Sequence, residues 1–218
     1  MRPGPAWAGK GCGSMAGVHP ELAPLAEYRE RLGRVVRTHP GVLLHLDEPI
    51  RLASGDLSRD FVDAKLAIDE PEAFRTAGEA MCRAAADAGA AFAAVGGLLV
   101  GAAPFTFAVS TVAGSRWFLV RTEPKGRGTD RWTEGTRLTE GMPVMLVDDV
   151  VTRGESIQKA CERVEAEGAV VVFATALVDR ADFSRRWFDR RGVPYEPILT
   201  YRDLGIEPVA GEDQPAAG

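Results

Sequence analysis

Cysteine and histidine are scarce in this sequence, with three of each in 218 residues. Cys12, Cys82 and Cys161 are odd in number and widely spaced, and no two of them form a C-x-x-C motif. Because a disulfide framework needs paired cysteines and a zinc site needs closely spaced ligands, neither is supported, and we assign no residue as a metal ligand. Such sparing use of cysteine is typical of proteins of the reducing cytoplasm.

An excess of positive charge is also missing. The chain has 26 Lys and Arg residues against 31 Asp and Glu residues, which gives a net charge of −5. A protein held to nucleic acid or to an acidic membrane by bulk electrostatics would be basic. We therefore expect neither partner and favour a small-molecule ligand.

Only one stretch is long and apolar enough to suggest a membrane span. Residues 88–115 carry no charge and exceed the length of a transmembrane helix. The stretch is rich in alanine, however, and is interrupted by several glycines and by Pro104. A buried strand, turn and helix of an α/β core would have the same composition, so we predict that structure and no membrane association.

The chain length suits a single α/β domain. Residues 1–20 are rich in glycine and proline and lack the apolar core of a secretory signal. This composition predicts a disordered extension and leaves Met1 or Met15 as the native start. We place one domain at residues 21–208 and a flexible tail at residues 209–218.

Hydrophobic periodicity predicts the order of the secondary structure. Residues 21–37 have apolar side chains at helical spacing, and residues 42–68 are short extended pieces around Pro49, which predicts a helix and then a small antiparallel appendage. We expect further helices at residues 71–88, 100–112, 155–167 and 182–191, and strands at residues 91–95, 116–121, 143–147, 169–178 and 196–201. Since the strands are apolar on both faces, they predict an α/β fold with a mostly parallel sheet flanked by helices.

The stretch VMLVDDVVTRGES, residues 144–156, combines two acids with an anion site. In a parallel sheet the ligand lies beyond the carboxyl ends of the strands, where Asp148 and Asp149 stand. The loop that follows turns at Gly154, and with the amino end of the next helix it offers backbone amides to a phosphate. Two carboxylates would repel that phosphate unless they face another part of the ligand, such as a diol or a bound Mg²⁺. A sugar phosphate meets both demands.

Two other interpretations of the acid pair stay open at this point. It could be a solvated pair at a strand end, or the acidic pocket of a response-regulator receiver domain. The receiver pair normally lies near the start of its domain, whereas about two thirds of this chain precedes Asp148. That position favours the sugar-phosphate interpretation.

The same stretch resembles the phosphoribosyl pyrophosphate (PRPP) binding motif of type I phosphoribosyltransferases. Four further segments are similar, in order, to parts of the orotate branch of that family: the hood segment ASGDLSRDFVDAK (residues 53–65), the pyrophosphate loop VGGLLVGAA (95–103), the mobile catalytic loop or lid RTEPKGRGTDRWTEG (121–135), and the strand end VDRAD (178–182). The resemblance covers residues 21–208 and implies the type I phosphoribosyltransferase fold, with a small hood subdomain at residues 38–70.

The resemblance also implies a reaction and a set of site residues. The ribose 5-phosphate group of PRPP would pass to a nucleobase, with orotate favoured, and Mg²⁺-bound pyrophosphate would leave. Asp148 and Asp149 would hold the ribose hydroxyls and the surroundings of the metal, Lys125 and Arg127 would close over the pyrophosphate, and Arg180 would meet the base. The remaining implied substrate-binding residues are Arg121 in the lid and the phosphate loop, Val151, Thr152, Arg153, Gly154, Glu155 and Ser156. The family further implies a homodimer.

Several positions depart from the family pattern. The usual lysines are replaced by Ala53 in the hood, Val100 in the pyrophosphate loop and Thr122 in the lid, and Arg153 enters a phosphate loop where small residues are commoner. These differences keep two alternatives open: a phosphoribosyltransferase for another base, and a PRPP-binding regulatory protein with little or no catalysis. The lid retains Lys125 among glycines, which favours an enzyme, although a plain charged surface loop has the same composition.

Overall fold

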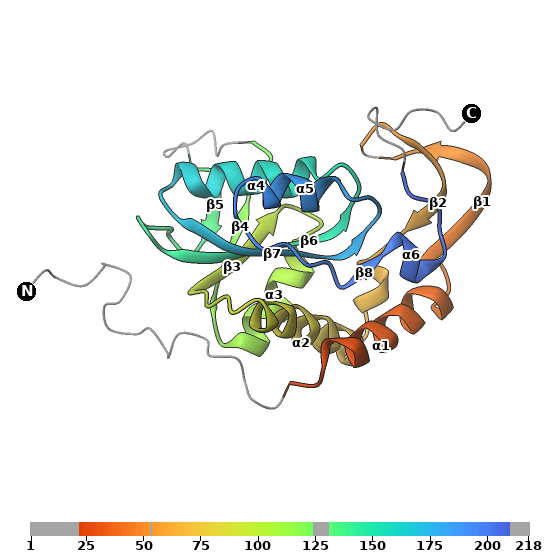
Figure 1. Cartoon of the computed structure of the whole chain (residues 1–218), viewed down its shortest axis with the longest axis horizontal. Coiled ribbons are helices and arrows are strands. Elements are labelled where there is room, and N and C mark those ends of the chain that lie inside the picture. Colours follow the sequence, from red (N-terminus) through yellow and green to blue (C-terminus); the bar gives the residue numbers. More distant parts are fainter. Residues whose placement is uncertain (1–21, 53, 124–130, 210–218) are drawn as a thin grey trace, which may run out of the picture.

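A six-stranded sheet forms the centre of the protein, with helices on both faces and a two-stranded hairpin at one end (Figure 1). The computed structural model describes residues 22–52, 54–123 and 131–209. The strands of the sheet, in spatial order, are β5 (Thr133–Gly135), β4 (Arg116–Val120), β3 (Ala94–Leu98), β6 (Pro143–Val151), β7 (Val170–Asp179) and β8 (Leu199–Thr200). Neighbouring strands are parallel except β5, which runs antiparallel to β4. The predicted mostly parallel sheet is confirmed.

The helices form two layers, with α1, α2 and α3 on one face of the sheet and α4 and α5 on the other (Figure 1). They are α1 (Leu25–Thr38), α2 (Pro71–Asp87), α3 (Ala103–Ala113), α4 (Glu155–Ala166), α5 (Phe183–Asp189), α6 (Tyr201–Leu204) and the 3₁₀ turn η2 (Leu66–Ile68). Met145 and Val147 of β6 pack into the first layer, whereas Val144 and Leu146 pack into the second. Because successive strand residues point to opposite faces, a continuously apolar strand requires this double cover.

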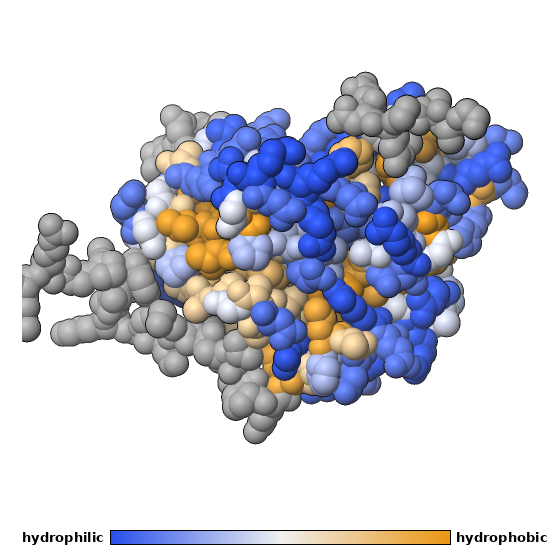
Figure 2. Space-filling model, in the orientation of Figure 1, coloured by the Kyte–Doolittle hydropathy of each residue, from blue (hydrophilic) through white to orange (hydrophobic). Residues whose placement is uncertain are grey.

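The surface reflects the layered arrangement. Hydrophilic residues cover α4 and α5, while hydrophobic residues reach the surface mainly in the band between the two helical layers (Figure 2). Val170, at the start of β7, is 48% exposed. Single apolar residues of this kind are ordinary on a folded surface.

The hood contains the antiparallel hairpin that the sequence predicted, formed by β1 (Leu43–Arg51) and β2 (Leu57–Val62). Alternate residues of β2 turn inward, so that Asp60 and Val62 are buried, while Leu57 and Phe61 face outward and are exposed. The hairpin therefore closes against the domain with one face only.

The uncharged stretch at residues 88–115 folds as predicted into a buried strand, a turn and a helix. It forms β3, a turn with a cis peptide bond between Leu99 and Val100, and α3, which ends at Gly114 in the left-handed conformation. In the parts of the chain that the structure describes, every helix is too short or too polar to cross a membrane.

Several boundaries differ from the predictions. The strand predicted at residues 91–95 lies three residues later as β3, and the helix predicted from residue 100 begins at Ala103. The first helix begins at Leu25 rather than at residue 21. The strand expected at residues 196–201 shrinks to the two residues of β8, because the Thr200 hydroxyl accepts a hydrogen bond from the Asp203 N–H and starts α6 instead. The predicted N-terminal extension and most of the predicted tail lie outside the described residues.

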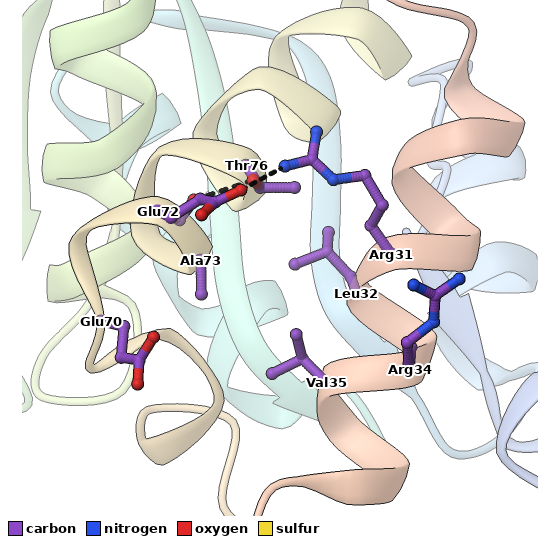
Figure 3. A pocket seen from close by; sticks show the side chains of 8 residues that line it. All are labelled: Arg31, Leu32, Arg34, Val35, Glu70, Glu72, Ala73 and Thr76. Atoms are coloured by element: carbon purple, nitrogen blue, oxygen red, sulfur yellow. Dashed lines mark hydrogen bonds and ion pairs between the residues drawn. The ribbon is translucent and has the colours of Figure 1, made fainter.

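A cavity of about 250 Å³ lies between α1 and the start of α2 (Figure 3). Its lining consists of Arg31, Leu32, Arg34, Val35, Glu70, Glu72, Ala73 and Thr76. Arg31 and Glu72 form an ion pair of 3.0 Å between its two walls. None of these residues belongs to the predicted site, so the cavity is separate from it.

Candidate active site

The carboxyl ends of β3, β6 and β7 meet at one edge of the sheet, because these three strands are neighbours and parallel. Asp148 and Asp149 lie near the end of β6, and Arg180 follows β7 directly. The predicted strand at residues 143–147 is longer than expected and runs to Val151, so both acids are strand residues. The structure thus brings the acid pair, the phosphate loop and Arg180 to one place.

The two adjacent acids have different surroundings. Asp148 is buried, with 4% of its surface exposed, and its Oδ1 accepts a hydrogen bond of 3.0 Å from the Asp149 N–H. Burial, reinforced by the negative charge of Asp149, raises the pKa of Asp148 well above its usual range. The Asp149 side chain is 18% exposed and lies 3.4 Å from Nζ of Lys65 in the hood. The pair therefore offers one acceptor deep in the site and one that faces outward.

The pyrophosphate loop lies directly against Asp149. A Cβ atom on Gly101 would stand 2.6 Å from both carboxylate oxygens of Asp149, and one on Gly97 would stand 2.1 Å from the Val147 carbonyl oxygen. A side chain at Gly97 would meet backbone, whereas one at Gly101 would require the Asp149 carboxylate to move. Val100, where the resemblance led us to expect a lysine, is 73% exposed in the same loop.

The phosphate loop, residues 151–156, joins β6 to α4. Gly154 is the N-cap of α4 with φ of 81°, and no side chain of the described residues caps that helix end. The Gln158 side chain donates to the Arg153 carbonyl at 3.2 Å, and the Gln158 N–H donates to the Gly154 carbonyl at 2.9 Å. The uncapped amino end of a twelve-residue helix is a ready site for an anion. Thr152 is half-buried and Ser156 exposed at its edge.

Arg153 does not point freely into solvent but binds Asp56 in the hood turn. Its Nε donates to Asp56 Oδ2 at 2.9 Å, and its Nη2 donates to Oδ1 at 2.6 Å. The hydrogen bond from Arg153 is the main reason that the pKa of Asp56 is lowered. The sequence marked Arg153 as unusual in this loop, but it contained no signal for the partner.

Arg180 is almost completely buried, with 1% of its surface exposed. Its Nη1 donates to the Asp60 carbonyl at 2.9 Å, its Nη2 donates to the Ser58 hydroxyl at 2.9 Å, and its Nε has no partner among the described residues. Arg180 therefore holds β2 of the hood against the sheet. Its predicted contact with the base stays a prediction.

Both ends of the lid are attached to α4. Lys159 Nζ lies 3.4 Å from the Thr122 carbonyl oxygen, and the Arg163 guanidinium stacks 3.5 Å from the ring centre of Trp132. The lid ends are thus fixed on the side of the sheet that carries the phosphate loop.

Of the predicted lid residues, the structure places only Arg121. Its N–H donates to the Trp132 carbonyl at 2.8 Å, and its Nη1 pairs with Glu134 at 2.8 Å, which joins the two sides of the lid base. Lys125 and Arg127 lie outside the described residues, and their roles stay predictions.

The structure adds a buried acid that the sequence did not indicate. Asp179, at the end of β7, is 4% exposed and accepts hydrogen bonds from the Tyr195 hydroxyl at 2.9 Å and the Ala181 N–H at 3.0 Å. Burial raises the pKa of Asp179 to about 6 despite these bonds. Asp179 is the last residue of the apolar strand β7. In the sequence it therefore looks like a solvated acid at a strand end, and only its burial in the structure distinguishes it.

Replacing Asp179 with Asn is expected to stabilise the protein at neutral pH. The folded pKa of about 6 exceeds the usual 3.8, so the folded state binds the proton of Asp179 more tightly than the unfolded state does. Proton binding therefore stabilises the fold at low pH, and this stabilisation is lost as pH rises from about 4 to about 6. Asn removes the buried charge, so the free energy of unfolding at pH 7 should rise by at most about 3 kcal/mol. Urea denaturation of both proteins at about pH 4 and pH 7 measures this; a gain that does not grow with pH contradicts it.

Comparisons with known proteins agree with this geometry. The family described as phosphoribosyl transferase domain matches residues 67–192. The orotate phosphoribosyltransferase of Rhodopirellula baltica is 36% identical over 166 residues, which cover 72% of this chain and 86% of that protein. The orotate phosphoribosyltransferase of Aquifex aeolicus is 35% identical over 182 residues, which cover 81% and 97% of the two chains.

Solved structures of the same kind share the fold. The crystal structure of Mycobacterium tuberculosis orotate phosphoribosyltransferase in complex with PRPP superposes with a TM-score of 0.65 at 29% identity, covering 82% of this chain and 99% of that one. The enzyme of Aeropyrum pernix gives a TM-score of 0.67 at 26% identity, with coverage of 79% and 95%. The chain belongs to the phosphoribosyltransferase family, among relatives that are orotate phosphoribosyltransferases.

Proposed function

We propose that the protein is an orotate phosphoribosyltransferase, which transfers ribose 5-phosphate from PRPP to orotate and releases pyrophosphate. One observation carries the proposal: the Asp148–Asp149 pair and the uncapped amino end of α4 lie at one edge of the sheet, joined by residues 150–154. This arrangement suits a ligand with hydroxyls at one end and a phosphate at the other. The relatives at about 35% identity support orotate as the acceptor.

Each part of the site has a distinct task in this reaction. Backbone amides of the phosphate loop bind the 5′-phosphate, and the acid pair accepts hydrogen bonds from the ribose hydroxyls. At C1 the bond to the pyrophosphate oxygen breaks and a bond to the base nitrogen forms, and the proton of that nitrogen passes to the departing pyrophosphate or to solvent. Positive charge develops on the ribose, and the fixed carboxylates of Asp148 and Asp149 stabilise it. Arg121, Lys125 and Arg127 are proposed to bind the departing pyrophosphate, and Arg180 the base.

We also propose that turnover depends on Mg²⁺. The ion prefers oxygen ligands in octahedral geometry and usually binds through one or two carboxylates together with substrate phosphates. Asp148 and Asp149 provide carboxylate oxygens beside the position proposed for the ribose, so they fit such an ion. When bound, Mg²⁺ would neutralise charge on the leaving pyrophosphate.

The proposed function is tested by mixing the protein with PRPP, orotate and Mg²⁺ and following the loss of orotate absorbance. We expect turnover that stops when EDTA removes the metal. Parallel reactions with uracil and the purine bases identify a different acceptor if orotate is not consumed. Binding of PRPP without consumption of any base would instead establish the regulatory alternative, which the missing lysines at Val100 and Thr122 favour.

We further propose a cytoplasmic homodimer. Phe107 of α3 and Trp117 of β4 are 38% and 40% exposed, and their rings form an edge-to-face pair at 5.2 Å. Apolar surface of this kind supports association with a second copy. Cys82 and Cys161 are buried free thiols, which suits a reducing compartment. Light scattering at working concentration should give twice the mass of one chain, and the mass of a single chain contradicts the dimer.

A further inference from the structure

A two-armed ion pair ties the phosphate loop to the hood. Arg153 uses Nε and Nη2 to bind the two carboxylate oxygens of Asp56, at 2.9 and 2.6 Å. The Asp56 side chain is 8% exposed and the Arg153 side chain 32%. Two parallel hydrogen bonds fix the direction of the guanidinium as well as its distance. The contact therefore determines where Arg153 points.

Both partners of this ion pair stand on turns that are braced internally. On the hood side, Asp56 Oδ2 also accepts from the Ser54 hydroxyl at 2.8 Å, and the Asp56 carbonyl accepts from the Leu52 N–H at 2.8 Å. On the loop side, the Arg153 carbonyl accepts from the Gln158 side chain at 3.2 Å. A shift of either turn is thus transmitted to the other through the ion pair.

We propose that Arg153 and Asp56 are positioning residues that set the shape of the 5′-phosphate loop and couple its occupancy to the position of the hood. The identity of the ligand as a ribose 5-phosphate rests on the proposed function. The hood also contacts the site through Lys65 and Arg180. Because coupling between two sites is reciprocal, phosphate binding restrains the hood, and a loosened hood weakens phosphate binding.

A direct role of Arg153 makes the opposite prediction. If the guanidinium left Asp56 to bind the phosphate, Asp56 would compete with the ligand. Replacing Asp56 with Asn would then release the guanidinium from this competing carboxylate and tighten phosphate binding. If Arg153 instead acts by holding Asp56 through its two parallel hydrogen bonds, the same substitution weakens phosphate binding. The direction of the change therefore separates the two mechanisms.

The experiment measures the dissociation constant of ribose 5-phosphate by calorimetry, which needs no turnover, for Asp56→Asn, Arg153→Lys and the double variant. Each variant should weaken binding about tenfold, and the double variant should be no weaker than either single one, because both remove the same contact. Arg153→Lys keeps the positive charge but cannot make the two parallel hydrogen bonds of a guanidinium. Tighter binding in Asp56→Asn, or additive losses in the double variant, overturns the proposal.

A matched control is Asp87→Asn, which also removes one carboxylate and breaks an ion pair, that of Arg83 at 2.7 Å on α2. It should leave ribose 5-phosphate binding unchanged; an equal loss would mean that net charge, and not the paired hydrogen bonds of Arg153, is responsible.

In steady state, Asp56→Asn should raise KM for both PRPP and orotate by about tenfold and change kcat less. Effects on kcat alone contradict a positioning role.

The outcomes keep this proposal apart from the proposed function. Suppose that the affinity for ribose 5-phosphate depends on Asp56 but the protein consumes no base. This result would support the coupling and contradict the catalytic function. Normal turnover with unchanged KM values in Asp56→Asn supports the function and overturns the coupling. A wild-type protein that binds no ribose 5-phosphate would overturn both.

Discussion

Replacing Asp149 with Asn is expected to lower kcat/KM for PRPP by about 100-fold. A hydrogen bond to a charged group contributes about 1.5–3 kcal/mol, which corresponds to about a 10- to 150-fold change in rate or affinity. Asn keeps the shape of the side chain, but it loses the negative charge and one acceptor oxygen. The developing positive charge on the ribose would then face a neutral amide, so the loss should appear in kcat as well as in KM.

Asp148→Asn should show a similar loss of activity together with a more stable fold. Its carboxylate is buried beside a second negative charge, which is why its pKa is raised. Removing the charge relieves that repulsion, so activity and stability should move in opposite directions, as is common for strained active-site groups. Initial rates and urea denaturation on the same samples measure both quantities.

The control for the acid pair is Asp189→Asn, at the end of α5, because this aspartate is exposed and far along the chain from β6. It should retain wild-type kcat/KM. If both site variants keep activity within a few-fold of wild type, the acid pair does not hold the ribose, and the proposed mechanism is wrong.

The elements of the core could be predicted from the sequence because their burial is recorded in local patterns. β6 and β7 are apolar on both faces, and each is followed by a polar residue at the carboxyl edge of the sheet. The acid pair could be placed for the same reason. Position at the end of a buried parallel strand is a property of the strand, and it needs no knowledge of distant partners.

Short elements escaped prediction because three residues carry no periodicity. β5 exists only because residues 133–135 pair with β4 at the sheet edge, where Val120 lies opposite Thr133 and Phe118 opposite Gly135. The sequence predicted a mobile loop through residue 135, whereas the structure assigns residues 133–135 to the sheet. Tertiary pairing thus overrides a sequence that gives no local preference.

The contacts between the hood and the sheet could not be foreseen. Arg153 and Asp56 are 97 positions apart, and Arg180 lies 120 positions from the Asp60 carbonyl that it binds. Hydrophobic patterns report on neighbours along the chain and are silent about such pairs. The predicted partner of Arg180 was the base, whereas the acceptor that the structure shows for its Nη1 is the backbone carbonyl of Asp60.

Gly101→Ala is expected to lower kcat/KM about 100-fold without unfolding the protein. An added Cβ would stand 2.6 Å from both Asp149 carboxylate oxygens, closer than real Cβ contacts allow. The carboxylate, at the end of a side chain, would have to turn away from its position beside Lys65. The loss should therefore match that of Asp149→Asn, and the two substitutions together should cost little more than either one.

Alanine substitutions at two other glycines separate this effect on Asp149 from a general loss of folding stability. At Gly97 the added Cβ would stand 2.1 Å from a backbone oxygen, that of Val147 in β6, which cannot rotate away. Gly97→Ala should thus destabilise the fold by several kcal/mol through overpacking. At Gly33 in α1 the nearest atom is 3.2 Å away on the flexible end of Arg37, and alanine favours the helix by about 1 kcal/mol. Gly33→Ala should therefore keep full activity and equal or higher stability.

Wild-type activity in Gly101→Ala would mean that the Asp149 carboxylate can move without consequence, and that Asp149 does not hold the ribose in a fixed position.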